Sequence, residues 1–219
     1  MKTKAYTDRL ATLRQRLASG TPAPCDAAWI TQPENRRYLS GFRAEDGHFP
    51  ESSGSLLIHG NRSLLVTDSR YTLQAEHEAP QLEIRILKQD LVDEMPSWVM
   101  DMGIRTLGFE PDYLSWGLHS KIQIRLQALS PPVELVPLDS LVEGLREVKD
   151  PEEIQALEAA ADLISDVLDE IVTHLRPGMT EREIAWKIEG LARERGAESL
   201  SFPPIVASGP NSALPHAVP

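Results

Sequence analysis

The most informative part of the sequence is the stretch Ser201-Phe-Pro-Pro-Ile-Val-Ala-Ser-Gly-Pro-Asn-Ser-Ala-Leu-Pro-His-Ala-Val-Pro219. Residues 205–207 form a short apolar run between prolines and a glycine, which is typical of a buried strand that ends in a loop. Gly209 and Pro210 then predict a turn over 208–211. His216 follows on a segment that its flanking prolines keep extended. Such a histidine can transfer a proton near neutral pH, although the residues alone favour an ordinary surface histidine.

Composition excludes several classes of protein. The chain has 219 residues, of which 41% are hydrophobic and 25% charged, and a formal net charge of −11. These values fit a globular protein of one or two domains and argue against nucleic-acid or anionic-membrane partners. Cys25 is the only cysteine, so an intramolecular disulfide is impossible. Neither a signal peptide nor an apolar run of ~20 residues is evident, so a cytoplasmic location is expected.

The first two thirds of the chain alternate between strand and helix patterns. Strands are predicted at 26–30, 55–59, 63–67, 82–87, 106–110 and 133–136, and helices at 6–18, 33–42, 71–78, 91–102 and 115–129. Gly60-Asn61-Arg62 joins two of the strands as a hairpin, and residues 43–53 are expected to form an exposed loop. Strands separated by helices of this length predict an α/β domain over residues 1–140, with a mixed, largely parallel sheet flanked by helices.

A second domain is predicted after a connector at 141–150. Asp150 and Pro151 carry the chain's strongest helix-start signal, and an apolar stripe then runs at three- and four-residue steps to Leu175. Thr180-Glu-Arg-Glu183 is a capping box that opens another helix. The second domain is therefore expected to occupy residues 151–219.

The residues reveal no complete catalytic motif. A zinc-binding H-E-x-x-H, a G-x-S-x-G turn and a phosphate-binding glycine loop are all missing. The histidines before His216 are scattered singly, and ordinary structural or solvated roles are expected for them. No metal ligand can be assigned.

Six short sequence motifs nevertheless follow one another along the chain in the order in which a known family has them. They are N-R-R-Y-L-S-G-F (35–42), L-L-V-T-D-S-R-Y (64–71), L-G-F-E (107–110), R-E-V-K-D-P-E-E-I (146–154), G-M-T-E (178–181) and the terminal I-V-A-S-G-P-N…P-H. Together they resemble the Xaa-Pro aminopeptidase, prolidase and creatinase family of M24-type metallopeptidases. The resemblance implies a creatinase-like N-terminal domain followed by an incomplete α+β "pita-bread" domain.

The resemblance also carries functional expectations. It makes His216 the catalytic and substrate-binding candidate, because the matching family histidine helps to hold the substrate carbonyl and to stabilise the tetrahedral intermediate. The family's two divalent metal ions (manganese, cobalt or zinc) are held by aspartates, a histidine and glutamates that lie downstream of that position. The chain is thus expected to bind no cofactor itself and to be inactive alone. Asp68 and Arg70 are expected to form a structural pair.

Three functions stay open at this stage. The first is the N-terminal portion of a peptidase that removes the residue preceding a proline, acting on peptides with proline at the second position. The second is a non-catalytic module that binds peptides or proteins or forms dimers, and the third is creatinase-type C–N hydrolysis. A homodimer is expected in which self-association buries the second domain's apolar helix stripe.

Overall fold

The structure is a computed structural model that describes residues 2–20, 25–44 and 53–219. Its contacts divide the chain into two compact units, residues 1–148 and residues 149–219. Each unit is described separately below. The part of the predicted 43–53 loop at 45–52 lies outside the described residues.

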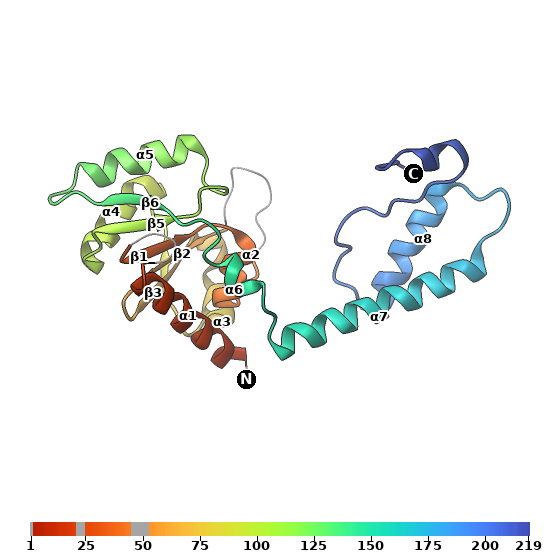
Figure 1. Cartoon of the computed structure of the whole chain (residues 1–219), viewed down its shortest axis with the longest axis horizontal. Coiled ribbons are helices and arrows are strands. Elements are labelled where there is room, and N and C mark those ends of the chain that lie inside the picture. The colour runs from red at the N-terminus through yellow and green to blue at the C-terminus, as the bar shows by residue number, and fades with distance from the viewer. Residues whose placement is uncertain (1, 21–24, 45–52) are drawn as a thin grey trace. The chain divides into compact units, whose positions relative to one another are not determined.

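The first unit contains one six-stranded sheet in the order β4-β3-β2-β1-β5-β6 (Figure 1). Its strands are β1 (Ala27–Ile30), β2 (Ser55–His59), β3 (Arg62–Thr67), β4 (Glu83–Ile86), β5 (Thr106–Phe109) and β6 (Glu134–Pro137). The β1–β5, β5–β6 and β3–β4 pairs are parallel, whereas β1–β2 and β2–β3 are antiparallel. The predicted mixed, largely parallel sheet is confirmed.

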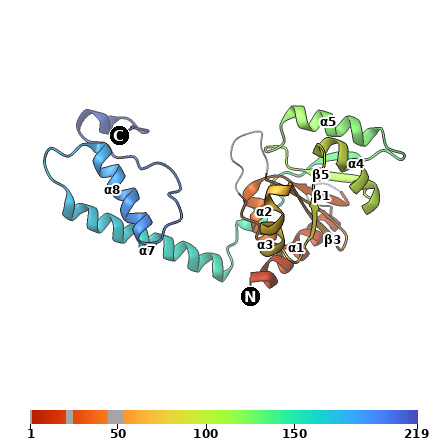
Figure 2. The same cartoon turned by 180° about the vertical axis from the view of Figure 1, so that it is seen from behind.

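Helices cover both faces of this sheet, so the first unit has three layers (Figures 1 and 2). They are α1 (Lys2–Ala18), α2 (Pro33–Ser40), α3 (Thr72–Glu78), α4 (Leu91–Met102) and α5 (Trp116–Gln127), with a short 3₁₀ turn η1 (Ser69–Tyr71) before α3. Side chains of β1 alternate between the two faces. Ala28 and Ile30 join the core with α1, α2 and α3, whereas Ala27 and Trp29 join the core with α4 and α5. The alternation explains why the whole strand is buried.

Gly41 ends α2 because the backbone there is left-handed. Its φ is 83° and its N–H donates to the carbonyl of Arg37, so the helix stops without strain. A Cβ at this position would also lie 2.6 Å from the ring of Tyr6 on α1. The glycine therefore both terminates one helix and lets a second helix approach.

Residues 141–148, which the sequence assigned to a connector, pack with the first unit. Leu141 and Val142 are 4% and 1% exposed and belong to the core shared with α1. The short helix α6 (Glu143–Arg146) follows, and Arg16 of α1 donates to the carbonyls of Leu141 and Gly144. The apolar start of this segment is what attaches it to the sheet domain.

The second unit consists of α7 (Pro151–His174), α8 (Glu181–Glu194) and the 3₁₀ turn η2 (Gly209–Ala213) (Figure 1). Both predicted helix starts are confirmed, since Asp150 with Glu153 and Thr180 with Glu183 form complete capping boxes. The core between the helices is small. It is centred on Val167, Ile171 and Ala192.

Candidate functional site

The C-terminal segment is fastened to the start of α8 by Glu181. One carboxylate oxygen, Oε1, accepts from the backbone N–H of Ser208 at 2.5 Å and from its hydroxyl at 3.3 Å. The other, Oε2, accepts from the Asn211 side-chain amide at 2.7 Å. These donors, the Ser208 N–H above all, hold the pKa of Glu181 below its usual value. Glu181 therefore fixes the loop that leads to η2 and His216.

His216 lies in a turn after η2 and is exposed. Its ring makes no hydrogen bond to any part of the chain that the structure describes, so both nitrogens can reach a ligand. The residues alone favour a surface histidine on an extended segment; the histidine is exposed, but it lies in a turn, and the sequence missed Glu181. A glutamate at a helix start usually serves the helix itself, so nothing in the sequence pointed to its contact with a loop 27 residues away.

The predicted strand at 205–207 is wrong. This segment has no regular secondary structure, and Ile205 is 49% exposed. A strand needs a neighbour for its backbone groups, and every pairing in the described residues belongs to the sheet of the first unit. The apolar run is therefore unpaired in the part of the chain that the structure describes.

The residues present do not fit a pair of metal ions. Within the described ranges, no three His, Cys, Asp or Glu side chains are grouped so that they could hold a metal ion. Glu181 is the acidic group bonded to the His216 loop, and both of its oxygens are occupied by Ser208 and Asn211. No catalytic step through a metal can be built from these side chains.

Residues from three of the six sequence motifs, those at 35–42, 107–110 and 146–154, form a buried polar network in the first unit. The Asn35 amide donates to Glu110 Oε1 at 2.7 Å, and Arg146 Nη1 donates to Asn35 Oδ1 at 2.7 Å. Glu110 Oε2 accepts from the N–H groups of Thr31 and Gln32 at 2.6 and 2.7 Å. Burial raises the pKa of Glu110 even so, because desolvation outweighs these donors. The network joins the end of β1, α2, the end of β5 and α6.

Asp68 and Arg70 form the structural pair that the sequence predicted. Arg70 Nε and Nη2 donate to the two carboxylate oxygens of Asp68 at 3.0 and 2.8 Å, and Asp68 also caps η1. The Arg70 side chain is 62% exposed, so the pair contributes little to stability.

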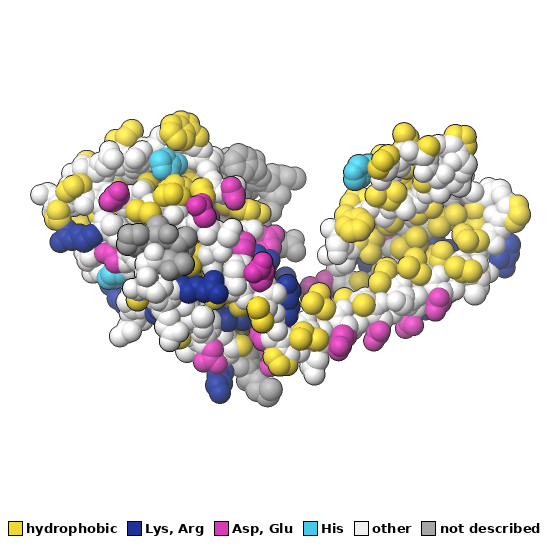
Figure 3. Space-filling model, viewed as in Figure 1, with side chains coloured by type: hydrophobic (Ala, Val, Ile, Leu, Met, Phe, Trp, Pro, Cys, Tyr) yellow, Lys and Arg dark blue, Asp and Glu magenta, His cyan; other side chains and the backbone are white. Residues whose placement is uncertain are grey.

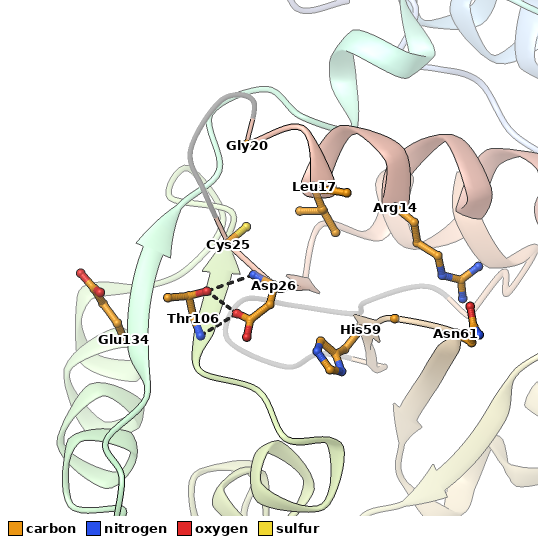
Figure 4. Close-up of a pocket in the computed structure, with 11 residues that line it drawn as sticks. Arg14, Leu17, Gly20, Cys25, Asp26, His59, Asn61, Thr106 and Glu134 are labelled. Carbon is orange, nitrogen blue, oxygen red and sulfur yellow. Dashed lines mark hydrogen bonds between the residues drawn. The ribbon is translucent and has the colours of Figure 1, made fainter.

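A cavity of about 880 Å³ lies at the opposite end of the sheet from Glu110, where β1, β5 and β6 begin (Figure 4). Asp26 lies at the start of β1 and accepts from the N–H groups of Arg105 and Thr106 at 2.9 and 2.7 Å and from the Thr106 hydroxyl. Desolvation would raise the pKa of Asp26, but these donors outweigh it and the pKa is lowered. Arg14 of α1 and His59 of β2 also line this cavity.

The second unit exposes much apolar surface (Figure 3). Trp186 and Val172 are 69% and 67% exposed, although they lie on the two helices that form this unit. Ten large apolar side chains of the described second unit are at least 44% exposed: Ile154, Leu157, Leu168, Val172, Leu175, Trp186, Phe202, Ile205, Leu214 and Val218. A surface of this kind is typical of an interface.

No helix among the described residues combines the length and apolar character needed to cross a membrane.

Both units are similar to known protein families. Residues 9–148 match the Creatinase/Prolidase N-terminal domain, and residues 155–219 match Metallopeptidase family M24. Uncharacterized peptidase YqhT of Bacillus subtilis strain 168 is 37% identical over 193 residues, covering 88% of this chain and 52% of that protein.

Solved structures agree with this assignment. An Xaa-Pro dipeptidase from Bacillus anthracis superposes with a TM-score of 0.83 at 33% identity, over 97% of this chain and 56% of that one. An X-Pro aminopeptidase from Thermotoga maritima MSB8 gives a TM-score of 0.76 at 35% identity, over 88% and 53%. The chain thus spans about half the length of the proteins that it matches.

The predicted resemblance and fold class are confirmed, since the matches follow the two units in order and the solved relatives share the mixed sheet. This chain belongs to the creatinase/prolidase family, with the beginning of an M24 metallopeptidase domain after its N-terminal domain.

Proposed function

We propose that this chain is the N-terminal part of an Xaa-Pro aminopeptidase-like metallopeptidase, which removes the residue preceding a proline from the N-terminus of a peptide. The observation that carries the proposal is the continuous likeness of both units to an Xaa-Pro dipeptidase and an X-Pro aminopeptidase. The cytoplasmic location expected from the sequence stays a prediction.

The proposed role of His216 is to hold the substrate. Its exposed ring, delivered by the loop that Glu181 fastens, donates an N–H to the carbonyl oxygen of the scissile bond. A donor aimed at this oxygen binds more strongly as negative charge develops on it, and so favours the tetrahedral intermediate. The partner is a peptide with proline at its second position.

The proposed cofactors are two divalent ions, manganese, cobalt or zinc, whose ligands would follow residue 219. When bound, such ions supply an activated water as the nucleophile. Because the described residues offer no such cluster, the 219-residue chain alone is predicted to be inactive.

The experiment compares two proteins, the 219-residue chain and the product of the full reading frame, on Xaa-Pro peptides with manganese. We expect turnover only from a longer product, and a His216→Ala variant of it should lose about 10²–10³-fold in kcat. A matched His174→Ala variant should retain activity, since His174 lies at the end of α7 and bonds to Glu170.

Each alternative predicts a different result. Metal-dependent turnover by the 219-residue chain would contradict its predicted inactivity. A reading frame that stops after Pro219 would favour the non-catalytic module, and cleavage of a guanidino compound in place of peptides would favour the creatinase-type reaction.

A further inference from the structure

The cavity beside α1 has no role in the proposed peptidase chemistry, yet its walls combine unusual features (Figure 4). Its lining comes from α1, from the starts of β1, β5 and β6, and from the end of β2 and the turn that follows it.

Arg14 places a positive charge in this wall without a counter-ion. Its Nη2 donates to the Ser63 hydroxyl at 2.7 Å, and no carboxylate of the described chain pairs with it. The side chain is half-buried, and desolvation lowers its pKa, which means that burial disfavours the unpaired charge. A guanidinium in such a place gains free energy when an anion binds to it.

The two acidic residues of the lining do not supply that anion. The Asp26 carboxylate already accepts hydrogen bonds from the backbone N–H groups of Arg105 and Thr106 and from the Thr106 hydroxyl, and these donors stabilise its negative charge. Glu134 is exposed at the rim, and Figure 4 shows its carboxylate directed away from Asp26 and His59.

The remaining walls provide apolar surface and neutral donors. Leu17 and Cys25 are 6% and 7% exposed and form an apolar wall, whereas the His59 ring and the Asn61 amide add polar groups. Neither His59 nor Asn61 has a side-chain hydrogen bond in the parts of the chain that the structure describes. A mostly apolar cavity with a few polar groups is the usual composition of a small-molecule site.

We infer that this cavity binds a small carboxylate with an apolar body, its head group on Arg14 and its body against Leu17 and Cys25. The inference is independent of the proposed peptidase function, because the cavity lies entirely in the first unit.

The experiment uses the 219-residue chain with three probes: octanoate, octan-1-ol and inorganic phosphate. Cys25 is the only cysteine, so the rate at which iodoacetamide alkylates its thiol, followed by intact mass, reports how accessible this wall of the cavity is with and without each probe. We expect octanoate to protect Cys25 saturably, and octanol and phosphate to protect it far less.

Variants test the head-group contact. Arg14→Gln should raise the half-saturating octanoate concentration at least about ten-fold, because a hydrogen bond to a charged group is lost. Ser63→Ala removes the partner of Arg14 but keeps the charge, and should change the concentration by less than about two-fold. Arg14→Lys, which keeps the charge without the planar fork, should lie between them and replaces Arg14→Gln should that variant fail to fold.

Several outcomes would overturn the inference. They are the absence of saturable protection, equal protection by octanol, protection by phosphate without octanoate, and octanoate binding that is unchanged in the Arg14 variants.

Discussion

The Asn35 amide donates to the Glu110 carboxylate across 2.7 Å, and the two side chains are 0% and 7% exposed. The same amide group accepts from Arg146 through its oxygen, so Asn35 connects the end of β5 to α6. Buried polar groups that satisfy one another in this way fix a single arrangement of the elements that carry them. Asn35 therefore adds a buried polar link between the sheet and α6 to the apolar contacts that Leu141 and Val142 make.

Replacing Asn35 with alanine should destabilise the first unit by about 2–3 kcal/mol, because both Glu110 and Arg146 lose a buried partner. Urea unfolding followed by tryptophan fluorescence measures this in a Trp186→Phe background, since Trp29, Trp98 and Trp116 all lie in the first unit. Gln127→Ala, at the exposed end of α5, is the matched amide control and should cost less than about 0.5 kcal/mol. Equal effects of the two substitutions would contradict the assigned role.

Glu110 should give the stability of this unit a distinctive pH dependence. Its pKa is raised in the folded chain, so the folded state binds the proton more tightly than the unfolded state does. The stability that it contributes is present below the unfolded value of ~4.3 and declines as pH rises through the folded value. The cost of Glu110→Gln should therefore shrink as pH increases, which urea titrations between pH 4 and 8 can measure.

Asp26→Asn is the control for that experiment, because the pKa of Asp26 is lowered in the fold. Its contribution is present above ~3.9 and is lost only as pH falls below that value, so between pH 4 and 8 the cost of this substitution should stay nearly constant. Parallel slopes for the two variants would contradict the prediction.

Gly108 shows how a single missing Cβ permits packing. A Cβ on this β5 residue would run into the side chain of Leu138, which is 2% exposed. Gly108→Ala should therefore destabilise the first unit by about 1–3 kcal/mol through overpacking. Gly117→Ala is the control, because a Cβ there meets nothing within 4 Å. Thermal unfolding of both variants tests the difference, and rescue of Gly108→Ala by Leu138→Ala would locate the clash.

Turns and helix starts in both units could be predicted because their signals are local. The Gly60 turn in the first unit and the Asp150 and Thr180 caps in the second each act within a few residues. The prediction of a strand at 205–207 was wrong because a strand forms only when a neighbouring strand pairs with its backbone, and a local sequence pattern does not reveal that neighbour. The contact between Glu181 and Ser208 was missed for the same reason, since it joins residues far apart in sequence.

Glu181 should control the order of the loop before His216. Glu181→Ala removes the acceptor of the Ser208 N–H, so amide exchange at Ser208 should become about five-fold faster or more. The pKa of Glu181 is lowered, so in the unmodified chain this protection is present above ~4.3 and is lost as pH falls. Glu189→Ala, which removes an ion pair with Arg193 on the same helix, should leave exchange at Ser208 unchanged.

Self-association should bury the apolar surface of the second unit. The side chains of Leu168 and Val172 are 49% and 67% exposed one helical turn apart on α7, which is costly in water. Light scattering of the 219-residue chain should therefore report a dimer, and the double substitution Leu168→Glu with Val172→Glu should convert it to a monomer by placing like charges at the contact.

The control for this last experiment is Leu73→Glu, because Leu73 is 81% exposed but lies on α3 of the first unit. If apolar exposure as such drove association, Leu73→Glu would weaken the dimer as strongly as the α7 variant does. If the α7 surface is the contact, only the α7 variant dissociates, and the monomer then binds a hydrophobic dye more than the dimer does, because the apolar side chains that the dimer covered are exposed. A monomer at every concentration that fails to bind the dye would contradict the prediction, since ten exposed apolar side chains would then have no energetic consequence.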